Sequence, residues 1–300
     1  MQIHIIMNPF SGGGRGQQVL DELLPILDHA KLPATVYTTT HAGHARELTA
    51  QINLDADDIT AVVGGDGTIS EVINGIMARH HGELPRLAVF PGGSGNSLCR
   101  DLDINSVQKA AAALMQGATK SIDLLQMDFG DGRPSALAFN IIGWGLITDI
   151  GEMAQRLRWL GGSQYTLATI LEIWRFPMRG GTVELDGVAF DGPFVFMLIC
   201  NTVHTGKGMR AAPRARLDDG LMDVVLLRDI PSRAALFRVF PRIFSGTHVD
   251  LPFVEYSQVQ KCVLHATPDS ALNIDGEIES YPPVSITVLP QVLSVFHPET

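Results

Sequence analysis

A glycine-rich turn with one carboxylate at its centre is the stretch of this sequence whose residue types could do chemistry. It follows the apolar residues 61–63 and precedes apolar residues at helical spacing; the turn comprises Gly64, Gly65, Asp66, Gly67 and Thr68. A strand, a tight turn and a helix start present bare N–H groups and a positive helix end, which favour phosphate. A carboxylate would repel phosphate directly, so Asp66 must hold Mg²⁺, accept a proton or cap the helix. The alternative is a strand-to-helix turn whose glycines serve geometry alone.

Two more glycine turns follow apolar strands and extend the candidate site. The first comes after a predicted strand at residues 3–7 and lacks the Gly-Lys-Ser/Thr ending of a Walker A loop; it offers Asn8, Ser11, Gly12 and Arg15. The second comes after a predicted strand at residues 86–90 and offers Gly93, Ser94 and Asn96. In open α/β sheets, ligands bind at the edge where the strands end. We therefore expect the turns to lie together at that edge.

The elements that must position these turns alternate between strand and helix over residues 1–128. Another strand is predicted at residues 34–38 and a helix at residues 17–30. Thr40 precedes a helix predicted to begin near Gly43 and is placed to act as its N-cap. Stacked βα units of this kind indicate an α/β domain with a mostly parallel sheet.

The pattern changes beyond residue 128. Asp-Gly turns and apolar segments such as residues 194–200 predict a mainly antiparallel second domain over residues 129–300, with only two clear helices. The last apolar strands, at about residues 284–296, either finish this domain or cross back to the first. One is a polar helix that contains residues 158–161, with Asp149 as a candidate N-cap before it. The other, at residues 232–244, carries Leu236, Phe237, Phe240 and Phe244 on one side, with Arg233, Arg238 and Arg242 interspersed. We expect that side to pack in the core; contact with anionic lipid is the alternative.

Composition narrows the classes of function. The formal net charge of −10 disfavours nucleic acid as a partner and requires a local patch for any membrane contact. No apolar run is long enough to cross a bilayer, and no signal peptide is visible at the start. The three cysteines are far apart, which indicates free thiols in a reducing compartment and argues against zinc. A cytoplasmic protein that associates peripherally with membranes fits these observations.

The Gly-Gly-Asp-Gly-Thr turn, followed by Glu71 and Asn74-Gly75, resembles the nucleotide motif of the diacylglycerol kinase catalytic family. That family includes bacterial lipid kinases, sphingosine kinases and ceramide kinases, and the resemblance covers nearly the whole chain. NAD kinases and phosphofructokinases share the shorter Gly-Gly-Asp-Gly core. The resemblance implies a Rossmann-like first domain, similar to those of NAD kinase and phosphofructokinase, and a β-sandwich second domain, with the active site between them.

The resemblance also implies roles for individual residues. ATP would lie on the three turns, and the further nucleotide contacts would be Thr40, Glu71, Arg158 and Asp275. A structural Mg²⁺ would bind the Arg216 carbonyl, Asp219 and the Leu221 carbonyl, although a plain hairpin turn explains this segment nearly as well. Asp149 would bind a lipid hydroxyl or order the site. Asp66 or Glu277 would act as general base, and both stay open.

Two features of the sequence bear on the identity of the acceptor. Sphingosine kinases carry a second acidic residue two places after the aspartate at position 149, and this chain has Gly151 there, which argues against a free sphingoid base. The motif Gly-Ser-Gly-Asn at residues 93–96 resembles that of sphingosine and ceramide kinases more than the Gly-Thr-x-Asn-Asp motif of bacterial members.

The sequence therefore predicts an ATP-dependent lipid kinase that meets its substrate, a diacylglycerol, ceramide or sphingoid-type lipid, at a membrane surface. An NAD kinase would share the central glycine turn. It would not explain residues 144–167, which resemble the segment that lines the lipid site in lipid kinases. A nicotinamide oxidoreductase would need a Gly-x-Gly-x-x-Gly turn, which is not placed correctly. A non-catalytic lipid-binding protein would be expected to have lost Asp66 or Glu277, and both are present. The oligomeric state, a homodimer included, is open.

Overall fold

The computed structural model describes residues 1–55, 57–79, 84–266, 270–279 and 282–298. The chain divides into two compact units. Unit 1 comprises Met1–Leu124 and Pro290–Thr300, and unit 2 comprises Leu125–Leu289. Each unit is described by itself.

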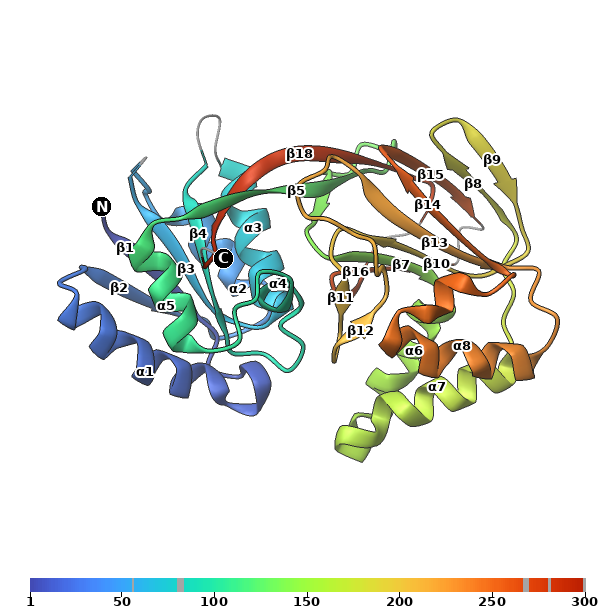
Figure 1. Cartoon of the computed structure of the whole chain (residues 1–300), viewed down its shortest axis with the longest axis horizontal. Coiled ribbons are helices and arrows are strands. Elements are labelled where there is room, and N and C mark those ends of the chain that lie inside the picture. The colour runs from blue at the N-terminus through green and yellow to red at the C-terminus, as the bar shows by residue number, and fades with distance from the viewer. Residues whose placement is uncertain (56, 80–83, 267–269, 280–281, 299–300) are drawn as a thin grey trace. The chain divides into compact units, whose positions relative to one another are not determined.

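Unit 1 is an α/β domain built on parallel strands (Figure 1). Its strands lie in the order β2-β1-β3-β4, and the last part of β18 continues this sheet beside β4, with Val295 opposite Leu87. Helix α1 packs against α5 and helix α2 against α3. The elements are β1 (Ile3–Met7), η1 (Ser11–Gly13), α1 (Arg15–His29), β2 (Ala34–Thr38), α2 (His44–Gln51), β3 (Ile59–Gly64), α3 (Asp66–Arg79), β4 (Arg86–Pro91), α4 (Ser97–Asp101), α5 (Val107–Gln116) and β5 (Thr119–Asp128).

Unit 2 is a β-sandwich with helices on one of its sheets. The six-stranded sheet is antiparallel, in the order β14-β13-β10-β7-β16-β17, and it faces a sheet that contains β15, β8 and β9. The elements are β6 (Ala136–Ala138), β7 (Ile141–Gly145), α6 (Leu146–Arg156), η2 (Arg158–Ser163), α7 (Gln164–Arg175), β8 (Gly181–Leu185), β9 (Val188–Asp191), β10 (Phe194–Cys200), β11 (His204–Thr205), β12 (Met209–Arg210), β13 (Met222–Arg228), α8 (Arg233–Ser245), η3 (Thr247–Asp250), β14 (Val254–Val259), β15 (Lys261–Ala266), β16 (Leu272–Ile274), β17 (Glu277–Glu279) and β18 (Val284–Phe296).

Two apolar cores hold unit 2 together. One lies between the sheets and includes Trp144 and Phe194, whose rings meet edge to face at 5.9 Å. The other lies on the outer face of the six-stranded sheet, where α6, α7 and α8 cover it (Figure 1). Apolar strands such as β10 are buried on both faces for this reason, which explains why they read as unbroken apolar runs.

Most strand predictions are confirmed, while the helices of unit 2 required correction. The strands at residues 3–7, 34–38 and 194–200 have the predicted bounds, and helix α8 lies one residue beyond the predicted range. The polar helix predicted to contain residues 158–161 is present but shorter: α6 ends at Arg156, and residues 158–161 lie in a 3-10 turn that Gly161, with φ +58°, interrupts. Helix α7 was not predicted. In α8, Leu236 is buried but Phe237 and Phe244 are exposed, so core packing holds for only part of the predicted side.

Candidate functional site

The three glycine turns of unit 1 lie at the same edge of the parallel sheet. In the strand register, Met7 pairs with Val63, and Gly64 pairs with Pro91. Each strand therefore ends at the same level, and Asn8, Gly65 and Gly92 follow directly. The expected convergence of the turns at one sheet edge is confirmed.

Backbone contacts between the turns require glycine. A Cβ on Gly12 would lie 2.4 Å from the Gly92 carbonyl oxygen, and Gly12 also has a left-handed φ of +57°. A Cβ on Gly93 would lie 2.4 Å from the Gly65 Cα. Any side chain at these positions would push the turns apart, so the glycines let three separate chain segments pack into one surface of main-chain groups.

Two asparagines fix the shape of the turns. The Asn8 side-chain amide donates to Thr68 Oγ1 at 3.1 Å, and its Oδ1 accepts from the Phe10 N–H. Asn96, with a φ of +54°, exchanges two hydrogen bonds with the backbone of Gly93, at 2.8 and 2.9 Å. The Asn96 amide, predicted to contact nucleotide, therefore also braces its own loop.

The described groups that face a ligand at the turns include main-chain donors, hydroxyls and the Arg15 cation. Helix α1 begins after Gly14, and no side chain in the described part of the chain caps its first turn. Its first N–H groups are thus available to an anion, beside Arg15 at the first helical position. Arg15 and Ser94 are exposed, and Ser11 is half-buried.

Asp66 is held by a residue that the sequence prediction missed. It is the first residue of α3, and its two carboxylate oxygens accept hydrogen bonds from the N–H and the Oγ–H of Ser97, at 2.7 and 3.1 Å. Of the roles considered for Asp66, capping is thus observed, although the helix it caps is α4. Ser97 directly follows Gly-Ser-Gly-Asn at a strand end, and this position was the signal available in the sequence.

The environment of Asp66 favours a proton acceptor. Burial raises the pKa of Asp66, and hydrogen bonds from Ser97 and Leu98 and the charge of Arg100 only partly oppose it. Burial, with the nearby Asp66, also raises the pKa of the Cys99 thiol, so this cysteine stays protonated and unreactive.

The prediction of Thr40 as a helix cap was wrong. Gly43 is the N-cap residue of α2, and the capping carboxylate comes from Glu71 on α3, which accepts from the Gly43 and Ala45 N–H groups at 2.9 and 3.0 Å. Thr40 is exposed, and its hydroxyl lies 3.1 Å from the His44 ring nitrogen. Glu71 therefore has a structural task, while its contact with nucleotide stays a prediction.

In unit 2, Asp149 is not an N-cap, because α6 begins three residues earlier, after Gly145. Its carboxylate instead forms a two-pronged ion pair with Arg179, at 2.5 and 2.7 Å. The hydrogen bond and charge of Asp149 raise the pKa of Arg179 against its burial. Arg158 is the exposed first residue of η2.

The Asp-Gly-Glu turn is held in place by the side chain of its first residue, Asp275. Asp275, with φ +51°, is buried and accepts hydrogen bonds from the backbone N–H groups of Phe139, Asn140 and Ile141, at 3.0 to 3.1 Å. Its carboxylate thus locks the turn to the start of β7. Glu277 begins β17 and is exposed.

The predicted magnesium loop has suitable oxygen donors. Asp219 is exposed and its Oδ1 accepts from the Leu221 N–H at 3.1 Å, which closes a tight turn, while Arg216 lies three residues before it. No group of three or more His, Cys, Asp or Glu side chains suited to a metal occurs among the described residues. One carboxylate and two carbonyls fit a hard cation that keeps several waters, as Mg²⁺ does.

Comparison with known proteins covers nearly the whole chain. Residues 2–127 match the model of the diacylglycerol kinase catalytic domain, and residues 140–297 match the YegS C-terminal NAD kinase beta sandwich-like domain. Similar proteins include a diacylglycerol kinase of Bacillus subtilis, 28% identical over 91% of this chain and 88% of the relative. Another is sphingosine kinase 1 of Arabidopsis thaliana, 24% identical over 91% of this chain and 67% of the relative.

Solved structures show the same fold. A crystal structure described as a diacylglycerol kinase from Bacillus anthracis has a TM-score of 0.74 at 19% identity and covers 99% of this chain and 97% of the other. A second structure from this organism, with the same coverage, reaches a TM-score of 0.80 at 21% identity. At these identities the likeness concerns the fold alone. Within the described ranges, no helix is both long and apolar enough to cross a membrane.

Proposed function

Because the chain belongs to the diacylglycerol kinase catalytic-domain family, we propose that it is a lipid kinase that transfers the γ-phosphoryl group of ATP to a lipid hydroxyl. The observation that carries this proposal is the convergence of three glycine turns around Asp66. Phosphoryl transfer needs in-line positioning and neutralised charge more than covalent chemistry. A surface of backbone N–H groups with one well-oriented carboxylate meets those needs.

We assign the parts of the reaction as follows. The phosphates of ATP lie on the turns of the first domain (residues 1–128), held by main-chain N–H groups, with Ser11, Arg15 and Ser94 beside them. Asp66 or Glu277 accepts the proton of the attacking hydroxyl. Arg158 compensates phosphate charge, and the Asp149–Arg179 pair orders the acceptor side. Mg²⁺ would supply further neutralisation of phosphate charge, and a separate structural Mg²⁺ would be held by Asp219 with the Arg216 and Leu221 carbonyls.

The sandwich domain, unit 2 (Leu125–Leu289), takes the acyl chains, and the acceptor is a diacylglycerol, ceramide or sphingoid-type lipid met at a cytoplasmic membrane surface. An NAD kinase is the second candidate, because the match to the sandwich domain bears that name as well. A lipid kinase and an NAD kinase differ in the acceptor, which is a membrane lipid for the first and the water-soluble NAD⁺ for the second.

The test is an acceptor panel. The full chain is incubated with Mg²⁺, radiolabelled ATP and, in separate reactions, micellar diacylglycerol, ceramide or sphingosine, or dissolved NAD⁺. We expect label in at least one lipid, and about a thousandfold less with whichever of Asp66→Asn and Glu277→Gln removes the general base. Label in NAD⁺ alone would overturn the lipid proposal.

A further inference from the structure

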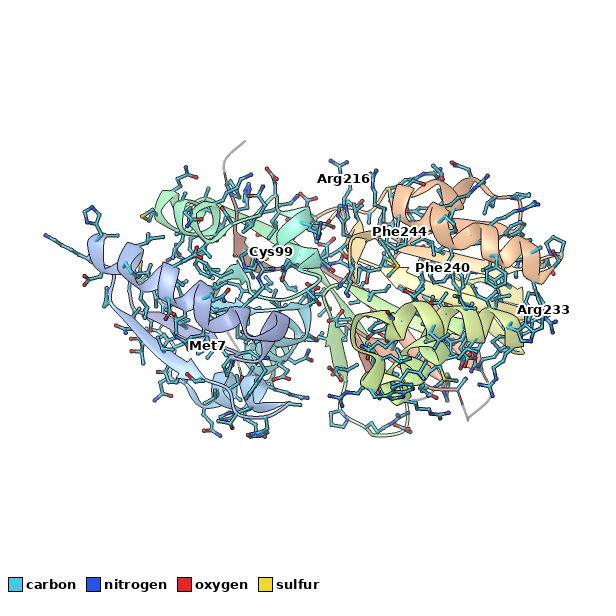
Figure 2. All side chains as sticks on the ribbon, turned by 90° about the horizontal axis from the view of Figure 1, so that it is seen from below. Met7, Cys99, Arg216, Arg233, Phe240 and Phe244 are labelled. Atoms are coloured by element: carbon cyan, nitrogen blue, oxygen red, sulfur yellow. The ribbon has the colours of Figure 1, made fainter. Side chains whose placement is uncertain are left out.

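A second cluster of reactive side chains begins at the amino ends of the unit 1 strands, whereas the glycine turns follow their carboxyl ends. Met7, labelled in Figure 2, is the last residue of β1, and the first turn comes after it. His4 lies three residues earlier in the same strand, and Asp58 directly precedes β3. Tyr37 lies on the neighbouring strand β2 and contacts His4. The proposed phosphoryl transfer uses none of these three side chains.

The cluster has the connectivity of a nucleophile, a base and an orienting carboxylate. The Tyr37 hydroxyl lies 3.2 Å from His4 Nδ1, and the two rings stack with their centres 5.9 Å apart. The other ring nitrogen of His4, Nε2, lies 3.5 Å from Asp58 Oδ2 and makes no hydrogen bond to any other described residue. His4 and Asp58 are buried, while Tyr37 is half-buried. The imidazole is thus held between one hydroxyl and one carboxylate.

Asp58 determines which nitrogen of His4 carries the proton. Burial raises the pKa of Asp58, but hydrogen bonds from two backbone N–H groups and the nearby His4 outweigh it and lower the pKa. Those donors belong to Asp55 and Gln2, at 3.0 and 2.7 Å. The carboxylate is therefore charged at neutral pH and favours a proton on Nε2 of His4. Nδ1 then offers its lone pair to the Tyr37 hydroxyl, as a general base does.

Tyr37 and His4 line a pocket of about 420 Å³, which is toward the lower end of ordinary ligand pockets. Its other walls lie at the end of α2 and just beyond it, and comprise Leu48, Gln51, Ile52 and Asn53. Two apolar side chains and two side-chain amides suit an uncharged ligand with a carbonyl group, because amide N–H groups donate to a carbonyl oxygen. No lysine or arginine belongs to this lining in the described part of the chain, and a phosphorylated ligand is therefore disfavoured.

We propose that Tyr37, His4 and Asp58 form a second reactive site, which takes activated carboxylic esters with a short acyl chain. The Tyr37 hydroxyl passes its proton to His4 Nδ1 while its oxygen bonds to the carbonyl carbon of the ester. The bond from that carbon to the leaving oxygen breaks, and the alcohol departs with the proton from His4. Tyr37 is left as an acyl ester, which water hydrolyses to the free acid with the same base.

The first experiment uses benzenesulfonyl fluoride, which converts a reactive tyrosine to a stable sulfonate ester with loss of fluoride. It needs neither ATP nor lipid, so its result is independent of the proposed kinase. The labelled full chain is digested and mapped by mass spectrometry, with Tyr165, which is 53% exposed, as the internal control. We expect Tyr37 to react at least about tenfold faster than Tyr165, although it is less exposed. Labelling of Tyr37 no faster than that of Tyr165 would overturn the proposal.

Two histidine variants test the base. His4→Gln should slow the labelling of Tyr37 about a hundredfold. The matched control His29→Gln removes an exposed histidine from the last turn of α1 and should be labelled as the parent is. Equal labelling of Tyr37 in the two variants would count against His4 as its base and overturn the proposal.

His4 is buried, so circular dichroism must establish that His4→Gln folds. Concentrated urea gives the same comparison on the parent chain without a substitution. In urea the triad is dispersed, and Tyr37 and Tyr165 should react at similar rates. A rate advantage of Tyr37 that persists in urea would show that the fold does not activate it, against the proposal.

The second experiment measures turnover of p-nitrophenyl acetate, an activated ester of a short acid. The parent should release p-nitrophenolate at a rate that saturates with ester concentration, and prior treatment with benzenesulfonyl fluoride should abolish this release. Tyr37→Phe keeps the ring but lacks the nucleophile, and it should be at least about tenfold slower. The matched control Tyr165→Phe should match the parent. Release by Tyr37→Phe at the parent's rate would overturn the assignment of acyl transfer to this site.

Discussion

Asp66 and Ser97 illustrate how one residue depends on another that is remote in sequence. The Ser97 side chain and backbone occupy both carboxylate oxygens of Asp66, at 2.7 and 3.1 Å, and so fix the direction of the carboxylate. Burial raises the pKa of Asp66 despite these bonds. A group so oriented, with its pKa moved toward neutrality, is suited to take a proton.

The first prediction separates the two candidate bases. Asp66→Asn and Glu277→Gln each remove one proton acceptor while keeping size and hydrogen bonding similar. The substitution at the true base should lower kcat by about a thousandfold or more, and the other should have a much smaller effect. Single-turnover phosphoryl transfer checks this, with circular dichroism to establish folding. Comparable, small losses in both variants would remove both residues from proton transfer.

A second prediction uses the pH dependence of kcat/KM. A general base acts deprotonated, so the rate rises as pH rises through its pKa. The Ser97 hydroxyl lowers the pKa of Asp66, and Ser97→Ala should therefore move the acidic limb to higher pH. Ser97→Thr keeps a hydroxyl and should leave the limb nearly in place. An acidic limb that Ser97→Ala does not move would favour Glu277 as the base.

At the residue scale, the sequence identified the site residues better than it identified their hydrogen-bond and ion-pair partners. The glycines and Asp66 were visible because their turn chemistry is local. Thr40 was assigned as cap of α2, yet the capping carboxylate comes from Glu71, 28 positions beyond Gly43 in the chain. Asp149 likewise pairs with Arg179, 30 positions away. Hydrogen bonds between distant segments leave no periodic signal, so sequence reasoning could not select these partners.

At the scale of elements, the turns work because their backbones touch. The prediction here compares two neighbouring glycines with left-handed φ, Gly12 (+57°) and Gly13 (+74°). Alanine at either position is strained by about 1–2 kcal/mol. Only at position 12 would its Cβ also meet another turn, the Gly92 carbonyl at 2.4 Å, whereas Gly13 has open space. Gly12→Ala should weaken ATP binding at least tenfold more than Gly13→Ala, as measured by calorimetry.

Another element-level prediction concerns Asp58, which joins the starts of β1 and β3. Burial pulls the pKa of Asp58 upward, but hydrogen bonds from the Asp55 and Gln2 N–H groups, at 3.0 and 2.7 Å, and nearby His4 outweigh it and lower the pKa. A lowered pKa stabilises the fold above the unfolded value of about 3.9 and loses that contribution as pH falls through the folded value.

Asp58→Asn should therefore lower the free energy of unfolding by about 2 kcal/mol at neutral pH. The difference between variant and parent should shrink below about pH 4, where the parent carboxylate also takes up a proton. Urea unfolding at neutral and acidic pH measures both. A deficit that stays constant across this range would show that the carboxylate charge is not what stabilises the strand starts.

Strands were the best predicted elements, and the reason is physical. A buried parallel or sandwich strand is a short, unbroken apolar run between turn residues, as in β1 and β10. Helix α7 escaped prediction because large apolar side chains such as Trp174 lie on its exposed side while the polar Thr169 and Glu172 are buried, so its residue types do not mark the buried side.

At the scale of the molecule, the two units are interleaved in the chain. Strand β18 begins in the sandwich, where it pairs with β15, and ends beside β4 in unit 1. There Leu293, Val295 and Phe296 are buried, and the Gln291 N–H donates to Asp123 at 2.7 Å. Unit 1 is thus built from two stretches of sequence that flank unit 2.

Removal of the residues after Leu289 should accordingly cost roughly 6 kcal/mol, from three buried apolar side chains alone. That is comparable with the whole stability of an ordinary domain, so unit 1 should unfold and ATP binding should be lost. A chain shortened only after Pro298 is the control and should melt as the parent does. Retention of ATP binding by the shorter chain would show that β18 is dispensable to the sheet.

The route of β18 also sets an order of events during synthesis. The ribosome makes the glycine turns early, yet the strand that completes their sheet emerges only after the entire sandwich. A nascent chain therefore holds no complete unit 1 sheet until translation has passed the last part of β18. If the proposed function holds, prematurely terminated polypeptides would therefore bind no ATP.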